Sequence, residues 1–168
     1  MELTARYCRM LDREVERTRR VVQNIPEGHD DFKPHEKSMP FGQLVGMLVS
    51  IPSWFTLILT QDALDINPVT PRHKPEPMST QHAWLAALDT SARSAREAFE
   101  KTSDAHLETS WSLQARGENV AVMPRADMII DTFGHLAHHR GQVTVYLRLL
   151  GADVPATYGP SADDKRYN

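Results

Sequence analysis

The chain has 168 residues, a length at which one domain buries a hydrophobic core without disulfides or structural metals. Its formal net charge is −3 and its acidic and basic residues are interspersed, which excludes the concentrated positive charge typical of nucleic-acid-binding proteins. The single cysteine excludes an internal disulfide and a cysteine metal cage, and no apolar run reaches the length of a membrane span. We therefore expect one domain over residues 1–168, soluble and cytoplasmic, with neither nucleic acid nor membrane as a partner.

The first predicted element is an amphipathic helix over residues 3–24. Apolar side chains recur in it at helical spacing with charged residues between them, and a proline and a glycine stop the pattern soon after its end. Cys8 lies off the apolar stripe, and we expect an unreactive, buried or half-buried thiol there rather than a nucleophile. Residues 29–37 are predicted to form an irregular linker, because Pro34 lacks a backbone donor and many of its neighbours are polar.

The second predicted helix covers residues 40–60. Its inner face carries apolar residues spaced alternately by four and three positions, namely Leu44, Leu48, Ile51, Phe55 and Ile58. Met47 and Trp54 lie at the edge of this face. Pro52 has no N–H group with which to continue the helical hydrogen bonds, so we expect it to bend the helix axis or to shift the hydrogen bonds of the helix.

A long crossover is predicted to follow this helix. Residues 62–79 contain four prolines and should form an extended surface loop that crosses over the helices or lines one end of them. We expect His73, inside this loop, to be solvated. The third helix is predicted over residues 80–101, with Ser79 or Thr80 as its N-cap.

Residues 104–123 carry the weakest helical pattern in the chain. A turn cluster at residues 116–119 separates two short apolar runs, which either pair as a hairpin or cover one end of the helices. The last helix is predicted over residues 124–150, with Pro124 in its first turn and Gly151 just after its end. Four long amphipathic segments joined by one long crossover indicate an all-α four-helix bundle.

The last predicted helix carries two histidines with metal-ligand spacing. His135 and His139 lie one turn apart, on a stripe that also holds Thr132 and Gln142 and that runs beside a fully apolar stripe. At about 1.5 Å per residue the two positions are roughly 6 Å apart along the axis, so both imidazoles can point at one ion. For a single buried histidine, a hydrogen bond to a neighbouring group is the simpler explanation. Four polar groups on one buried stripe need a common explanation, which a metal ion or a polar ligand pocket supplies.

Four stretches of the chain recur together in one protein family. They are KPHEKSM at 33–39, PSW at 52–54, HLAHHRGQ at 135–142 and YGPSAD at 158–163. On these stretches the chain resembles, over nearly its whole length, the DinB and YfiT-like family of bacterial metal-dependent helical proteins. The resemblance implies an up-down-down-up four-helix bundle with a long crossover loop, often dimeric, in which three histidines hold a divalent ion such as nickel or zinc.

The resemblance also implies which residues bind the ion. His135 and His139 match the pair on the last helix, and the third histidine, from the second helix, corresponds to Met47. A thioether is a soft ligand that suits copper(I) better than nickel or zinc. Asp131 and His138 are candidate replacements for the third ligand. Asp131 alternatively fixes the tautomer of an imidazole or is an exposed helix residue, and His138 alternatively has a surface or packing role.

Two classes of function follow from this resemblance. Some family members resemble thiol-dependent transferases, in which the ion lowers the pKa of a low-molecular-weight thiol such as bacillithiol or mycothiol and the thiolate attacks an electrophile. The first expectation is therefore a metal-dependent transferase whose pocket is lined by Met47, Gln142 and Tyr146, with catalytic residues and substrate unassigned. The second is a non-catalytic family member that binds a small molecule or acts as an interaction module, because Met47 replaces a ligand. A homodimer is expected in both cases.

Overall fold

The computed structural model describes residues 2–70 and 77–164. The helices are α1 (Leu3–Val22), α2 (Phe41–Ser50), α3 (Pro52–Thr60), α4 (Gln81–Lys101), α5 (Asp104–Leu107) and α6 (Arg125–Leu149), and the strands are β1 (Ala63–Asp65), β2 (Ser110–Ala115) and β3 (Glu118–Pro124). The four long helical segments predicted from the sequence are all present, the second of them as two helices. His73 lies outside the described residues, so its solvation stays a prediction.

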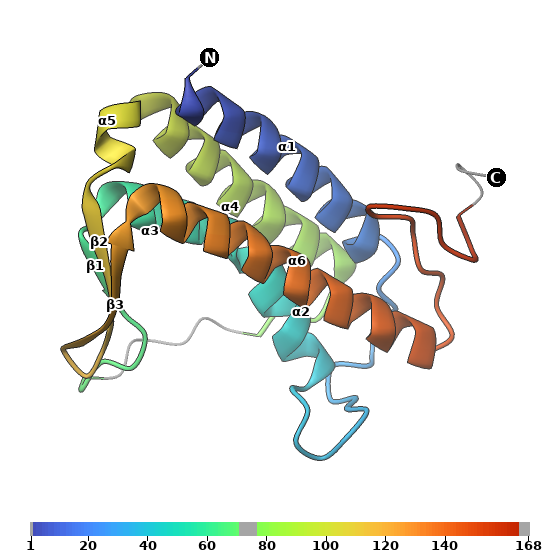
Figure 1. Ribbon diagram of the computed structural model, residues 1–168. Coiled ribbons are helices and arrows are strands. Elements are labelled where there is room, and N and C mark those ends of the chain that lie inside the picture. Colours follow the sequence, from blue (N-terminus) through green and yellow to red (C-terminus); the bar gives the residue numbers. More distant parts are fainter. Residues whose placement is uncertain (1, 71–76, 165–168) are drawn as a thin grey trace.

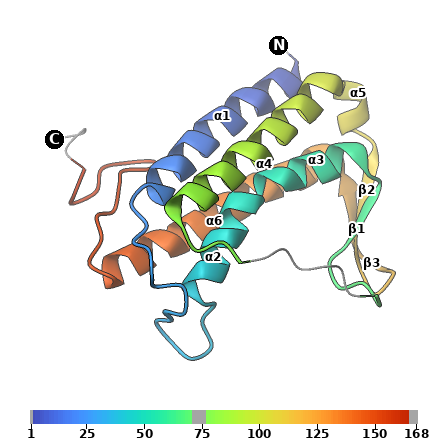
Figure 2. The same ribbon diagram turned by 180° about the vertical axis from the view of Figure 1, so that it is seen from behind.

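The long helices pack side by side in two directions. α1 and α6 run one way, whereas α2, α3 and α4 run the other way (Figures 1 and 2). α1 contacts α4 and α6, and the α2–α3 pair contacts the same two helices from the other side. Because α3 and α4 run in the same direction, the chain has to return along the molecule between them, which explains the long crossover.

The predicted bend at Pro52 is confirmed. Pro52 is the first residue of α3, and the axes of α2 and α3 differ by 46°. The N–H of Ile51 still donates to the carbonyl oxygen of Met47 over 3.1 Å, but Pro52 has no N–H to donate to the next carbonyl. The bend lets α2 follow the C-terminal half of α6 and α3 its N-terminal half.

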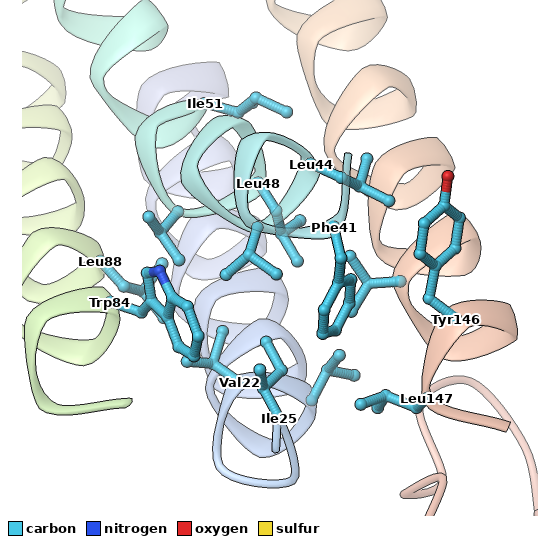
Figure 3. Packing of buried hydrophobic residues seen from close by; sticks show 14 of the residues in the cluster. Val22, Ile25, Phe41, Leu44, Leu48, Ile51, Trp84, Leu88, Tyr146 and Leu147 are labelled. Atoms are coloured by element: carbon cyan, nitrogen blue, oxygen red, sulfur yellow. The ribbon is translucent and has the colours of Figure 1, made fainter. Parts of the chain in front are cut away.

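Buried side chains form two hydrophobic cores along these helices. In the first core, α2 lies between Trp84 and Leu88 of α4 on one side and Tyr146 and Leu147 of α6 on the other (Figure 3). The second core joins α1, α3, α4 and the N-terminal half of α6, with Phe55 near its centre. Full burial of one large apolar side chain stabilises the fold by about 1.5–3 kcal/mol. Both halves of α6 are therefore held firmly against their neighbours.

The expectation of an all-α chain is wrong in one region, which forms a three-stranded sheet in the order β1-β2-β3. β2 and β3 pair antiparallel, so the hairpin alternative for residues 104–123 is confirmed. β1 comes from the crossover that was predicted as a loop, and it pairs parallel with β2. The hairpin turn contains Arg116 (φ 54°) and Gly117 (φ 80°), whose N–H groups donate to the carboxylate of Asp65 over 3.2 and 2.8 Å. The sheet is thus held by contacts between segments about fifty residues apart.

Two predicted helix ends are also confirmed. The hydroxyl oxygen of Thr80 accepts a hydrogen bond from the N–H of Ala83 over 3.2 Å and caps the start of α4. After α6, Gly151 adopts φ 74°, and the N–H of Ala152 donates to the carbonyl oxygen of Leu147 over 3.0 Å. These contacts complete a glycine C-cap of the Schellman type.

Within the described residues, none of the helices taken singly has the length and apolar character needed to cross a membrane, although the bent α2–α3 pair would pass that test jointly. The apolar side chains on the inner face of that pair belong to the two hydrophobic cores.

Candidate metal-binding site

His135 and His139 lie in the middle of α6, on the side that faces α2 and α3. The rotation of α6 is set by the apolar stripe next to them, because Leu136 and Val143 are completely buried. His139 is consequently buried, with 8% of its surface exposed, and His135 is half-buried. One side of the pair is packed inside the protein, while the other remains within reach of a small ligand.

The two imidazoles point at each other. Nε2 of His139 lies 2.7 Å from Nε2 of His135, and the ring centroids are 4.6 Å apart. Two nitrogens at this distance form a hydrogen bond only if one carries the proton and the other offers its lone pair. The helical spacing of four residues therefore brings both nitrogens to one point, as the sequence suggested.

Gln142 determines which nitrogen of His139 carries the proton. Its side-chain oxygen Oε1 lies 2.7 Å from Nδ1 of His139. A carbonyl oxygen can only accept, so Nδ1 is the protonated nitrogen and Nε2 keeps its lone pair. Gln142 thereby aims the lone pair of His139 at His135, and an amide or carboxylate partner of this kind is a usual support for a metal-binding histidine.

The pKa values of both imidazoles are lowered. For His135 burial is the largest cause, and the charges of protonated His139 and His138 lower the pKa further. For His139 burial is again the largest cause, while the hydrogen bond with Gln142 raises the pKa and His138 lowers it. Both rings are therefore favoured in the neutral form, in which one ring nitrogen is free to act as a metal ligand.

Trp54 forms the wall of the site on the α3 side. Its ring lies 4.9 Å from the ring of His135, at an interplanar angle of 70°. From the sequence, Trp54 was expected only at the edge of the second helix. It stands two helical turns after Met47, however, and this spacing is the signal that places both residues on one side of the α2–α3 pair.

Met47, the residue at the expected third-ligand position, is half-buried on α2 and packs against the first core. Two ring contacts give the register of α2–α3 against α6: Trp54 with His135, and Phe41 stacked on Tyr146 at 5.6 Å. Met47 lies midway between Phe41 and Trp54 in the chain. The antiparallel register therefore brings Met47 level with the turn of α6 that follows His135.

The other candidate residues are placed as follows. Asp131 and His138 are exposed on α6, with the ring of His138 5.1 Å from that of His139 and on its outer side. The hydroxyl of Tyr146 donates to the carbonyl oxygen of Met39 over 2.9 Å, which engages it at the start of α2. Among residues 2–70 and 77–164, no group of three or more His, Cys, Asp or Glu side chains is arranged to hold a metal ion.

Next to the pair, Arg140 anchors α6 to α1 through a buried ion pair. Its Nη2 lies 2.6 Å from Oε2 of Glu14, and only 1% and 4% of the two side chains are exposed. Tyr158 of the C-terminal segment donates its hydroxyl to the same carboxylate oxygen over 2.8 Å. The sequence does not identify this ion pair, because Glu14 is one of several charged residues on an amphipathic helix. The network holds the rotation of α6 and thus the direction of the histidines.

Comparison with known proteins identifies the family. The model of the DinB family matches residues 1–167. "Uncharacterized protein YrdA" of Bacillus subtilis (strain 168) is 32% identical over 84 residues, which are 46% of this chain and 50% of that protein, so the match spans about half the length of this curated relative.

Two crystal structures of DinB-like proteins show the same fold. One, from Bacillus cereus ATCC 10987, has a TM-score of 0.67 at 18% identity and covers 90% of this chain and 95% of its own. The other, YjoA from Bacillus subtilis, has a TM-score of 0.66 at 17% identity and covers 95% of this chain and 99% of its own. With a helical fold, an imidazole pair on its last helix and a family match over almost its entire length, the chain belongs to the DinB family.

Proposed function

We propose that this protein binds a metal ion through Nε2 of His135 and Nε2 of His139, between α6 and the α2–α3 pair. The observation that carries the proposal is the convergence of the two nitrogens to 2.7 Å, with the lone pair of His139 directed by Gln142. An ion at this point would replace the proton that the two nitrogens share. The lowered pKa values of both rings support the proposal, because a metal ion and a proton compete for the same lone pairs.

The residues do not fit the three-histidine set that the family resemblance implied for nickel or zinc. A catalytic zinc ion usually has three protein ligands and one open position, whereas this chain has two imidazoles and carries Met47 at the position that the resemblance gives to the third histidine. In such sites the ion acts as a Lewis acid and lowers the pKa of a bound thiol. In this chain, Gln142 would hold the proton on Nδ1 of His139, and Trp54 would shield His135 from water.

For the activity, we propose transfer by a low-molecular-weight thiol such as bacillithiol, with the ion's open positions available to the thiol. This partner belongs in a reducing compartment such as the cytoplasm, which agrees with the single, unpaired Cys8. A non-catalytic role in binding a small molecule is the second candidate, and the replacement of an imidazole by Met47 is the observation that favours it.

Metal titration tests the site. Purified protein should bind one equivalent of a metal ion in competition with a chromophoric chelator, and His135→Ala or His139→Ala should abolish this binding. His82→Ala, at an exposed position at the start of α4, is the matched control and should bind as wild type does. Unchanged binding in both site variants would refute the proposed function. Consumption of bacillithiol with an electrophile by the metal-loaded protein, lost in His139→Ala, separates the transferase from the binding role.

We also propose a homodimer formed through the outward face of α6. Ile130, Val145 and Leu149 are 56%, 57% and 56% exposed on this face. Gly134 and Gly141 lie among them, and neither position would be crowded by a side chain within the protomer. A glycine inside a helix costs about 0.5–1 kcal/mol relative to alanine. A second helix that approaches closely over the two glycines would offset this cost.

A further inference from the structure

We infer that the site selects copper(I), bound by His135, His139 and the thioether sulfur of Met47. This inference rests on the proposed function, since it needs the imidazole pair to bind a metal ion at all. It departs from the nickel or zinc site that the family resemblance implied, and the reasons lie in this chain's own residues.

The position of Met47 follows from the packing of α2 against α6. The contact between Trp54 and His135 and the stacking of Phe41 on Tyr146 make the two segments antiparallel neighbours over this whole stretch. Met47 and Trp54 are two turns apart and therefore on the same side of the α2–α3 pair. Because Trp54 meets His135 and Phe41 meets Tyr146, Met47 lies level with the turn of α6 that holds His139. A methionine side chain has three rotatable bonds and adapts readily to a ligand position.

The donor set is soft. Thioether sulfur favours copper(I), and imidazole nitrogen is a good ligand for copper as well as for zinc and nickel. Nickel and zinc gain little from a thioether, and the described residues bring no third His, Cys, Asp or Glu to the pair. Two imidazoles and one thioether therefore discriminate in favour of copper(I), where three imidazoles would not.

The charge of the ligand set also favours copper(I). An imidazole that offers a ring-nitrogen lone pair to a metal ion is neutral, the thioether is neutral, and Asp131 on the same helix is exposed. Without a carboxylate to compensate it, the charge of the ion remains in a half-buried place beside Trp54. The cost of taking an ion out of water rises with the square of its charge. A monovalent ion is therefore favoured over a divalent one.

The test compares Met47→Leu with the wild-type residue. Leucine conserves the volume of methionine and removes the sulfur, so the packing of α2 should be kept. Cys8 is the strongest competing copper(I) ligand in the chain, so both proteins carry Cys8→Ala. Met10→Leu, at another half-buried methionine on α1, is the matched control. Affinities are measured anaerobically, for copper(I) against a chromophoric copper(I) chelator and for zinc and nickel against a chromophoric dication chelator.

We expect Met47→Leu to lower the copper(I) affinity by more than the roughly 10 to 100-fold that loss of a supporting contact costs, and to leave zinc and nickel affinity nearly unchanged. X-ray absorption of the copper(I) protein should detect a sulfur neighbour that disappears in Met47→Leu and persists in Met10→Leu. Met47→His should shift the preference from copper(I) to nickel and zinc.

Two outcomes would contradict the inference. If Met47→Leu binds copper(I) as tightly as the reference, while His139→Ala does not, the imidazole pair binds metal and the role of Met47 is wrong. If His135→Ala and His139→Ala bind every ion as well as the reference does, the proposed function fails and the inference fails with it. Circular dichroism of each variant confirms that a loss of binding is not a loss of folding.

Discussion

The buried ion pair between Glu14 and Arg140 provides a sharp test of how α6 is held. Glu14→Gln keeps the size of the side chain and removes its charge. In the wild-type protein the carboxylate accepts hydrogen bonds from Arg140, Tyr158 and Arg17, and both members of the ion pair are almost completely buried. After the substitution, Arg140 retains the carbonyl oxygen of residue 14 at 3.2 Å and the hydroxyl of Thr18 at 3.1 Å, which are neutral acceptors.

The expected loss is large because a charge stays buried without its counterion. Removing one partner of a buried ion pair typically costs about 3–5 kcal/mol, whereas replacing both partners by apolar groups is often neutral or stabilising. Glu14→Gln still accepts one hydrogen bond through its amide, so we expect about 3 kcal/mol. In a chain of this length that corresponds to a fall in melting temperature of about 6–12 °C. The double variant Glu14→Gln, Arg140→Met should recover most of the loss.

Urea denaturation followed by circular dichroism measures these free energies of unfolding. Asp12→Asn is the matched control, since the pair between Asp12 and Arg96 is about half exposed on both sides and should contribute about 0–1 kcal/mol. A loss below about 1 kcal/mol for Glu14→Gln would mean that the pair behaves like a surface pair, and the account of how α6 is anchored would be wrong. A double variant as unstable as the single one would show that packing, rather than charge, sets the cost.

Three further predictions concern pH, the metal site and assembly. Burial raises the pKa of Glu14, but the hydrogen bonds from Tyr158 and Arg140 and the charge of Arg140 outweigh this and lower it below the ordinary value of 4.5. The folded state thus binds this proton less readily than the unfolded state, so the contribution of Glu14 to the stability of the folded state is present above pH 4.5 and is lost as the pH falls through the lowered pKa. The melting temperatures of wild type and Glu14→Gln should therefore converge in acid. A difference in melting temperature that stays constant with pH would contradict this. Gln142→Leu should lower metal affinity by about 10 to 100-fold in a competition titration, because Nδ1 of His139 loses its acceptor, and equal affinity would remove Gln142 from the site. Gly141→Arg should convert the dimer to a monomer of 19.0 kDa in light scattering, while Thr90→Arg, on the exposed side of α4, should leave the dimer intact. A wild-type mass of 19.0 kDa would refute the dimer.

Several features of the site follow from contacts that the sequence alone does not reveal. Asp131 was considered as the residue that fixes the tautomer of an imidazole, yet the side-chain partner of Nδ1 of His139 is Gln142, one turn later on the same helix. Both residues lie about one turn from a histidine, and only the side-chain conformations adopted in the packed structure decide which of them reaches a ring. Trp54 was likewise missed as a site residue, because its contact with His135 depends on how α3 leans on α6 after the bend at Pro52.

The sequence by itself determined the long helices, a break in the helix at Pro52, a cap at Ser79 or Thr80, the end of α6 at Gly151 and the convergence of His135 and His139. All of these depend on residues within a few positions of one another, where the helical repeat, a missing N–H or a positive φ leaves little choice. Only the tertiary structure decided the pairing of β1 with β2 and the ion pair of Glu14 with Arg140, whose partners are far apart in the chain. A three-residue strand has too little intrinsic preference to be recognised without its neighbour, and a buried charge is indistinguishable in sequence from an exposed one until its counterion is in place.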